Sequence, residues 1–125
     1  MTDIKLKRSY DPASADDGYR ILVDRLWPRG LRKADFKYDL WEKRLAPSTG
    51  LREWFHADPV GRASEFERRY EAEIKANPAF PAFVAIVDSH PTVTFLYSSK
   101  DREVNNAEVL RRAVLTTSRQ GNLET

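Results

Sequence analysis

The alternation of apolar and polar residues predicts the strands of this chain. Residues 4–8 alternate apolar with basic side chains, which is the period-two pattern of a half-buried edge strand. Residues 19–23 and 92–97 are rich in β-branched, aromatic and other apolar residues, so both are predicted to be buried strands. Residues 36–40 also alternate and favour another strand, although the run as far as Leu45 would equally fit a helix.

Apolar residues at helical spacing predict the helices between and after these strands. Ser48 is the predicted N-cap of a short helix, and Asp58 before a proline is the predicted N-cap of a longer one. A further helix is expected across residues 80–87. Asn105 is predicted to cap the last helix, with Glu108 three residues later completing a capping box.

The order of these elements predicts one α/β domain. We expect a small sheet, at least partly parallel, covered by about four helices, because a strand that follows a crossover helix usually lies parallel to its neighbour. The domain is expected to span residues 1–119, with residues 120–125 as a disordered tail. A chain of 125 residues with 41% hydrophobic residues is long enough to bury a core of its own.

Composition narrows the chemistry. The chain has no cysteine, which excludes disulfides, thiol nucleophiles and thiolate metal sites and suits a reducing compartment. Neither a signal-peptide pattern nor a run of ~20 apolar residues is present, so we expect a cytoplasmic protein with no membrane role. The scattered glycines form no phosphate-binding fingerprint, and His56 and His90 lack metal-ligand spacing. We therefore predict no cofactor and no metal.

Charge is nearly balanced overall but locally positive. The chain has 21 basic and 19 acidic residues, for a net charge of +2. Five basic residues gather in one segment and face only Asp24 in opposition: Arg20, Arg25, Arg29, Arg32 and Lys33. This segment could contribute to a pocket for a small anion, or form a basic patch for nucleic acid or a protein partner.

Two loops at the ends of predicted strands carry most of the candidate chemistry. Residues 24–30 follow one strand and residues 98–101 follow another. Ligands of open parallel sheets lie beyond the carboxyl ends of the strands, so we expect these loops to converge. The candidate general bases are Asp24 and Asp101. The candidate ligands of a phosphate or carboxylate are Arg25, Arg29, Lys43, Ser48, Arg52 and Lys100.

Several of these residues also have a structural interpretation. Asp24 would fit a salt bridge or a hydrogen-bond hub that ties loops together, and Ser48 is most simply an N-cap. Trp27 and Trp54 are expected to pack between layers, as large rings usually do. Lys43 lies two residues after Trp41, hence on the same face of a strand, and its role is left open.

A set of short motifs resembles the YeaO-like branch of the family called domain of unknown function 488. They are VDRLWPRG at residues 23–30, Trp41 with Lys43, APS at 46–48, LR at 51–52, WF at 54–55, LY at 96–97 and KD at 100–101. The resemblance spans residues 4–119 and implies a small α/β fold with no established activity.

The chain departs from that family's pattern in its last loop. A second branch has cysteines in and after the segment corresponding to residues 96–106, where this chain has Tyr97, Asn105 and Asn106. The YeaO-like pattern often has histidine at about Asn106. The resemblance therefore implies that thiol chemistry is not carried over, and it weakens an acid–base role for this loop.

Two functions follow from these observations. The first is a small-anion-binding domain, with or without enzymatic activity, that uses the arginines at the strand ends. The alternative is an accessory or regulatory protein that binds nucleic acid or a protein through a basic patch. Geometry separates them, because a pocket requires Arg25, Arg29 and Lys100 to line one concavity, whereas a patch requires a convex surface. The sequence leaves the oligomeric state open.

Overall fold

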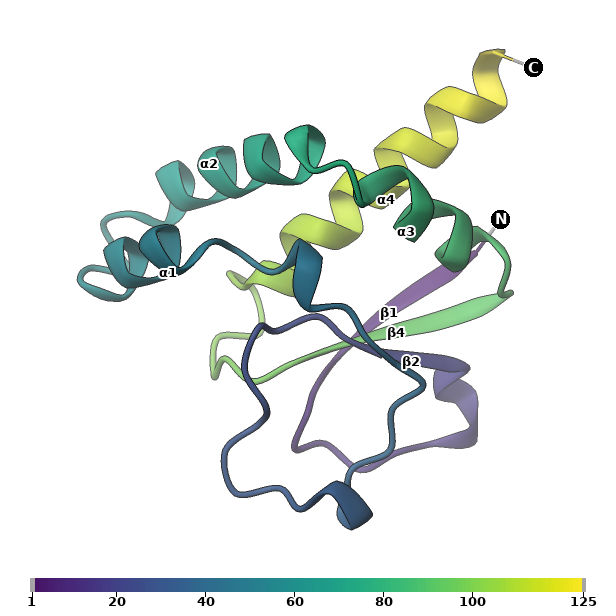
Figure 1. The fold of residues 1–125 in the computed structure, drawn as a ribbon, viewed down its shortest axis with the longest axis horizontal. Coiled ribbons are helices and arrows are strands. Elements are labelled where there is room, and N and C mark those ends of the chain that lie inside the picture. The colour runs from purple at the N-terminus through teal and green to yellow at the C-terminus, as the bar shows by residue number, and fades with distance from the viewer. Residues whose placement is uncertain (1, 125) are drawn as a thin grey trace.

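The computed structural model of the protein describes residues 2–124. Its sheet has the strand order β1-β4-β2-β3, and every neighbouring pair is parallel (Figure 1). The strands are β1 (Asp3–Arg8), β2 (Tyr19–Leu22), β3 (Leu40–Trp41) and β4 (Thr92–Tyr97). The small α/β fold expected from the sequence is confirmed, with β1 at an edge as predicted.

β4 is the centre of the sheet. It pairs with β1 from Asp3 opposite Thr92 to Arg8 opposite Tyr97, and with β2 on its other side. Its last five residues are buried. A nearly continuous apolar run is what a parallel strand covered on both faces requires, which explains why residues 92–97 carry the clearest strand pattern in the sequence.

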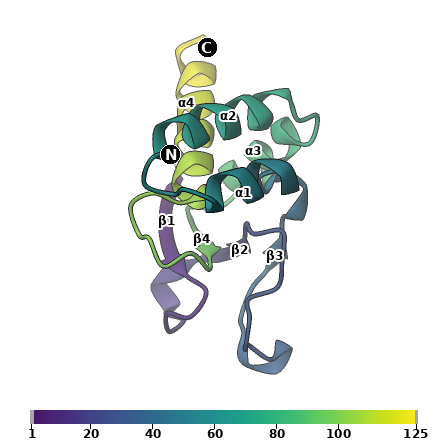
Figure 2. The same cartoon turned by 90° about the vertical axis from the view of Figure 1, so that its left-hand side faces the viewer.

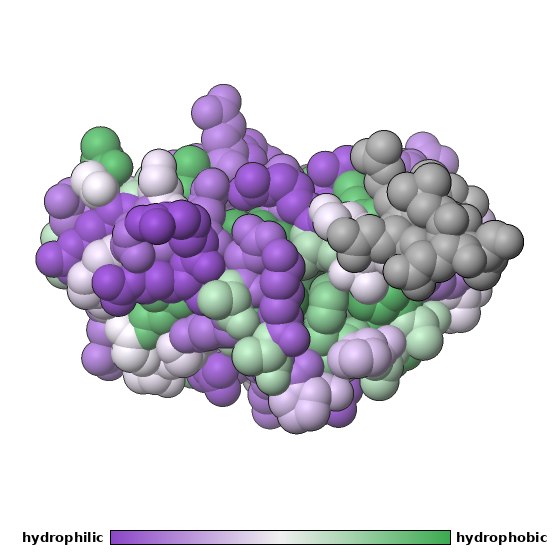
Figure 3. Space-filling model, turned by 90° about the horizontal axis from the view of Figure 1, so that it is seen from above, coloured by the Kyte–Doolittle hydropathy of each residue, from purple (hydrophilic) through white to green (hydrophobic). Residues whose placement is uncertain are grey.

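Four helices lie together on one face of the sheet (Figures 1 and 2). They are α1 (Thr49–His56), α2 (Ala63–Ala76), α3 (Phe80–Asp88) and α4 (Asn106–Glu124). The main core forms between them and the side chains of Ile21, Val23 and Phe95. Seen from the helical side, the molecular surface is largely hydrophilic (Figure 3). No helix in the described part of the chain has the length and apolar character needed to cross a membrane.

The connection between β2 and β3 covers the other face of the sheet. Leu22 and Leu96 point to this face and are buried against Phe36. The ring of Trp27 packs edge-on against Phe36, with 5.4 Å between centroids, and its indole Nε1 donates to the carbonyl oxygen of Leu31 at 2.6 Å. A segment without long regular structure thus supplies the second hydrophobic layer.

Two boundaries differ from those expected. The predicted strand at residues 36–40 is reduced to β3, because Phe36 turns onto the second face of the sheet instead of pairing in register. Asp58 does not cap α2. Its Oδ1 accepts from the amide of Gly61 at 3.1 Å in a separate turn, and α2 begins at Ala63 after Arg62 has bonded to the carbonyl oxygen of Trp54.

Helix α4 extends into the segment that was predicted to be a disordered tail. Its backbone is helical to Glu124, through most of the segment expected to be disordered, and Thr125 lies outside the described residues. The division of the chain into a domain and a tail stays a prediction. At its other end, the amide of Glu108 donates to Oδ1 of Asn105 at 2.9 Å, so the predicted cap is confirmed.

A buried ion-pair cluster closes the amino end of the sheet. The carboxylate of Asp17 accepts from Lys7 at 2.7 Å and from Arg20, while its carbonyl oxygen accepts from the hydroxyl of Thr94 at 2.7 Å. Gly18, with φ of 65°, follows at once, and a Cβ there would collide with the carbonyl group of Thr92. Glycine is therefore required where this cluster meets β4.

The second layer can be tested by truncating Phe36. Phe36→Ala should lower the free energy of unfolding by about 3 kcal/mol, because it leaves a cavity over Leu22 and Leu96. Denaturant unfolding measures this loss. Val60→Ala is the control, since Val60 is 92% exposed. Equal effects of the two substitutions would show that the β2–β3 connection is not a second hydrophobic layer.

Candidate functional site

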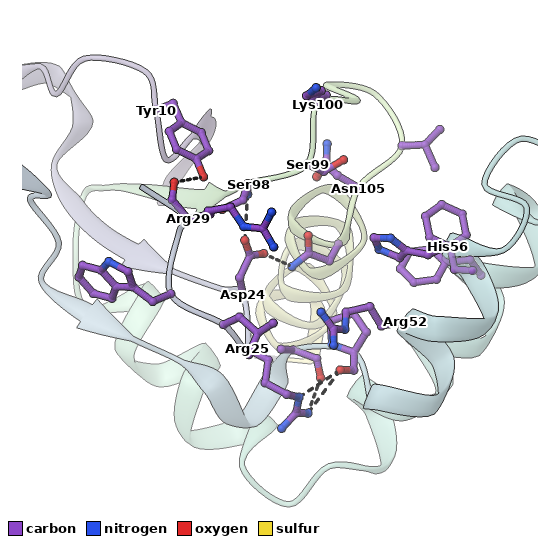
Figure 4. A pocket seen from close by; sticks show the side chains of 18 residues that line it. Tyr10, Asp24, Arg25, Arg29, Arg52, His56, Ser98, Ser99, Lys100 and Asn105 are labelled. Atoms are coloured by element: carbon purple, nitrogen blue, oxygen red, sulfur yellow. Dashed lines mark hydrogen bonds between the residues drawn. The ribbon is translucent and has the colours of Figure 1, made fainter. Parts of the chain in front are cut away.

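A pocket of about 420 Å³ opens at the carboxyl ends of β1, β2 and β4 (Figure 4). Its walls come from the loops that follow these strands, from α1 and from the start of α4. The two loops singled out in the sequence, at residues 24–30 and 98–101, both contribute to it. They converge because β2 and β4 are parallel neighbours.

Asp24 joins three elements at the base of this pocket. Its Oδ2 accepts from the backbone amide of Ser98 at 2.8 Å, and its Oδ1 accepts from the side-chain amide of Asn106 at 2.9 Å. The end of β2 is thereby tied to the end of β4 and to the first residue of α4. Asp24 forms no salt bridge with any described residue, so its structural role is that of a hydrogen-bond hub.

Burial dominates the electrostatics of Asp24. Removal from water raises the pKa of its carboxyl group above the ordinary value of 3.8, and the hydrogen bonds from Asn106 and Ser98 offset this only in part. The charge of Arg52 also favours the ionised form. Asp24 thus carries a carboxyl group that burial makes harder to ionise and whose two oxygens each accept one hydrogen bond.

The turn of the WPRG segment presents Arg29 to the pocket. The amide of Leu31 donates to the carbonyl oxygen of Pro28 at 3.3 Å, and Gly30 has the positive φ, 84°, that the third position of such a turn demands. The hydroxyl of Tyr10 donates to the carbonyl oxygen of Arg29 at 2.8 Å. Backbone contacts therefore fix the position from which the Arg29 guanidinium enters the pocket (Figure 4).

Helix α1 contributes Arg52 and His56. Ser48 caps this helix, accepting from the amide of Leu51 at 3.2 Å and donating its hydroxyl to Glu73 at 2.6 Å. Arg52 lies one turn further on, and its Nε is buried without a hydrogen-bond partner. His56 follows after another turn. In Figure 4 the side chains of Arg29, Arg52 and His56 point from different sides towards the space beside Asp24.

Arg25 lines the pocket but is aimed elsewhere. Its guanidinium donates to the carbonyl oxygens of Ala46 and Pro47 at 3.3 to 3.4 Å, and it points away from the centre of the pocket (Figure 4). It links the loop after β2 to the segment that leads into α1. Lys100 is exposed and stands at the rim.

Three of the predicted site residues lie outside this pocket. Lys43 is exposed and places its ammonium group 4.0 Å from the centre of the Trp41 ring. Ser48 is engaged as the cap of α1. Asp101 is exposed and accepts from the amides of Glu103 and Val104, both at 2.9 Å, which lower the pKa of its carboxyl group.

Cations outnumber acids in the pocket. Its lining holds four basic side chains, Arg25, Arg29, Arg52 and Lys100, against one carboxylate, that of Asp24. None of these four forms an ion pair among the described residues, and six described basic residues outside the pocket also form none. The distinguishing feature of the pocket is that four basic side chains line one concavity with a single carboxylate, which concentrates positive charge there.

The basic segment noted in the sequence does not form one surface. Arg20 is buried in the ion-pair cluster with Asp17, and Arg25 is directed at backbone carbonyls. Arg32 is exposed and paired with Asp35. In the described part of the chain, no three His, Asp or Glu side chains lie close enough together to hold a metal ion.

Sequence reasoning missed several residues that line the pocket, among them Tyr10, His56 and Asn105. His56 could have been found, because it lies four residues after Arg52 and therefore on the same face of α1. Tyr10 gave no comparable signal, since only the parallel pairing of β1 with β4 brings its loop to this edge.

Comparison with known proteins agrees with the fold and its motifs. The family model described as the inactive DUF488-N3 subclade matches residues 3–124. The chain therefore belongs to this subclade of the domain of unknown function 488 family, and the resemblance to its YeaO-like members is confirmed.

Two bacterial relatives illustrate the similarity. The chain is 45% identical to the uncharacterized protein YeaO of Escherichia coli K12 over 108 residues, which are 86% of this chain and 93% of that protein. It is 45% identical to the uncharacterized protein Rv3073c of Mycobacterium tuberculosis H37Rv over 78 residues, or 62% of this chain and 65% of that protein. No solved structure matches the chain.

The role of Asp24 as a hub can be tested by removing its carboxylate. Asp24→Ala should lower the free energy of unfolding by about 1–3 kcal/mol, because the partly buried amides of Ser98 and Asn106 lose their acceptor. Asp101→Ala is a matched control, since its carboxylate also accepts from two amides but water can replace it. Urea unfolding that shows equal losses would exclude the hub.

The rim of the pocket should respond to acid through Asp11. Two hydrogen bonds from Arg102, at 2.9 and 3.0 Å, tie the loop after β1 to the loop after β4. They lower the pKa of Asp11 from 3.8 to about 2. The stability that this pair contributes is therefore present above pH 3.8 and lost as the pH falls through about 2.

Unfolding midpoints of the wild type and Asp11→Asn at pH 6, 3 and 2 would measure this. The difference between the two proteins should be modest at pH 6, because Arg102 is largely exposed, and should vanish near pH 2. Asp16→Asn, which replaces an exposed acid in the same connection, is the control. A difference that stays constant down to pH 2 would contradict the assignment.

Proposed function

We propose that the pocket binds a small anion through a phosphate or carboxylate group, and that Arg29 and Arg52 hold this group. The observation that carries the proposal is that the side chains of Arg29 and Arg52 point into one concavity whose lining holds a single carboxylate. The turn fixes the backbone of Arg29 and helix α1 fixes that of Arg52, so both side chains project into the pocket from defined backbone positions.

Arg52 adds an energetic argument. A buried donor without a partner is costly, and an anionic oxygen beside its Nε would supply a charge-assisted hydrogen bond. The hydroxyl of Ser98, also buried without a partner, lines the same pocket and offers a second polar contact. An anionic ligand would give both groups a hydrogen-bond partner.

Binding without catalysis fits the site better than an enzymatic role. Each oxygen of Asp24 accepts a hydrogen bond that ties the strand ends to α4, so this carboxylate already has a structural role that ligand binding alone leaves undisturbed. Asp101 lies outside the pocket. The family description as an inactive subclade supports the same choice.

The proposal can be tested by thermal shift with inorganic phosphate, sulfate and acetate. Ligand binding to the native state increases the free energy of unfolding and therefore raises the unfolding temperature. At a ligand concentration 100 times Kd the increase in free energy is about 2.7 kcal/mol. At least one of these anions should stabilise the wild type. Arg29→Met and Arg52→Met, which keep apolar bulk and remove the charge, should abolish that shift.

Arg32→Met is the matched control, because Arg32 is an exposed arginine of the same connection but does not line the pocket. It should keep the full shift. The proposal fails if no anion stabilises the wild type, or if Arg32→Met loses as much stabilisation as Arg52→Met does.

A further inference from the structure

The pocket is larger than a bare inorganic anion requires. Its volume of about 420 Å³ falls in the range, roughly 300–1,000 Å³, of pockets that enclose organic ligands. A phosphate held between Arg29 and Arg52 would occupy only one side of this space. The remaining lining therefore indicates what else the ligand carries.

That lining is apolar and partly aromatic. Phe55 of α1 stacks on Phe66 of α2, with ring centroids 4.2 Å apart and 25° between the planes, and both rings line the pocket. Val104 lies in the loop before α4 and completes this wall. The ring of Phe55 lies edge-on to that of His56, with 6.0 Å between centroids, and Figure 4 shows His56 opposite Arg29.

Exposed hydrophobic side chains gather at the mouth of the pocket. Among the described residues only Tyr10, Leu26 and Val60 are large hydrophobic residues with substantial exposure, and the first two line this pocket. Leu26 is 56% exposed although it stands in a loop between charged residues. Exposed apolar groups at the edge of a concavity are typical of a ligand-binding site.

We propose that the ligand is an organic acid with an apolar body about the size of one aromatic ring. Its carboxylate or phosphate lies between Arg29 and Arg52, and its body lies between Leu26 and the pair of Phe55 and Phe66. This inference rests on the proposed anion site and adds the chemical class of its ligand. Burial of the ring drives binding, and the charged group sets the orientation.

Matched pairs of probes test the apolar body. Isothermal titration calorimetry would compare phenyl phosphate with inorganic phosphate, and 3-phenylpropionate with acetate. In at least one pair the aromatic acid should bind about ten-fold or more tightly than its small partner, because only the aromatic acid contacts the apolar wall. Arg52→Met should weaken both members of that pair.

Leu26→Ser tests the wall without endangering the fold, because Leu26 is exposed. It should reduce the ratio of the affinity for the aromatic acid to that for the small anion at least three-fold. Val60→Ser, at an exposed position that does not line the pocket, should leave the preference intact. Phe55→Ala should act in the same direction as Leu26→Ser.

The outcomes separate the two proposals. Equal affinity for aromatic and small acids would overturn the inference about the ligand class and leave the anion site standing. Binding of benzyl alcohol as tight as that of 3-phenylpropionate would overturn the anion site itself. No binding of any probe would overturn both.

Discussion

The buried carboxylate of Asp24 holds the sheet and the helical layer together where the pocket opens. Its two oxygens accept from the ends of β4 and the start of α4, so three elements meet on one side chain. Burial raises the pKa of this group, which shows that the contact is formed against a desolvation penalty. Both hydrogen bonds at this carboxyl group are donated to it, one by a backbone amide and one by a side-chain amide.

The β2–β3 connection couples the fold to the site. Trp27 packs on the second face of the sheet, and two residues later the same turn presents Arg29 to the pocket on the carboxyl edge. The indole Nε1 of Trp27 donates to the carbonyl oxygen of Leu31 and so links the second hydrophobic layer to the turn. The β2–β3 connection thus forms the second hydrophobic layer and also supports the backbone of Arg29. Loosening the packing of Trp27 would therefore displace Arg29.

Local patterns predicted most of the fold, and tertiary contacts account for the rest. The strand at residues 92–97 and the cap at Asn105 depend on residues close in sequence, and both are confirmed. The predicted start of α2 at Asp58 was wrong, because the side chain of Arg62 donates to the carbonyl oxygen of Trp54 in the preceding helix and α2 begins only after it. In the site, strand ends pointed to Asp24 and Arg29. No local signal showed that Lys43 would settle on Trp41 instead of approaching the pocket.

The basic side chains that line the pocket are arranged differently from those on the helices. The chain carries 21 basic and 19 acidic residues, and across the helices most basic groups have acidic partners one turn away, as Arg69 and Lys75 do. The four basic residues of the pocket form no such ion pair in the described part of the chain, although the charge of Arg52 lowers the pKa of Asp24. Departures from local consistency are expected at functional sites. Arg29 and Arg52 point into one concavity beside an apolar wall, and the proposed acid with an apolar body would contact both.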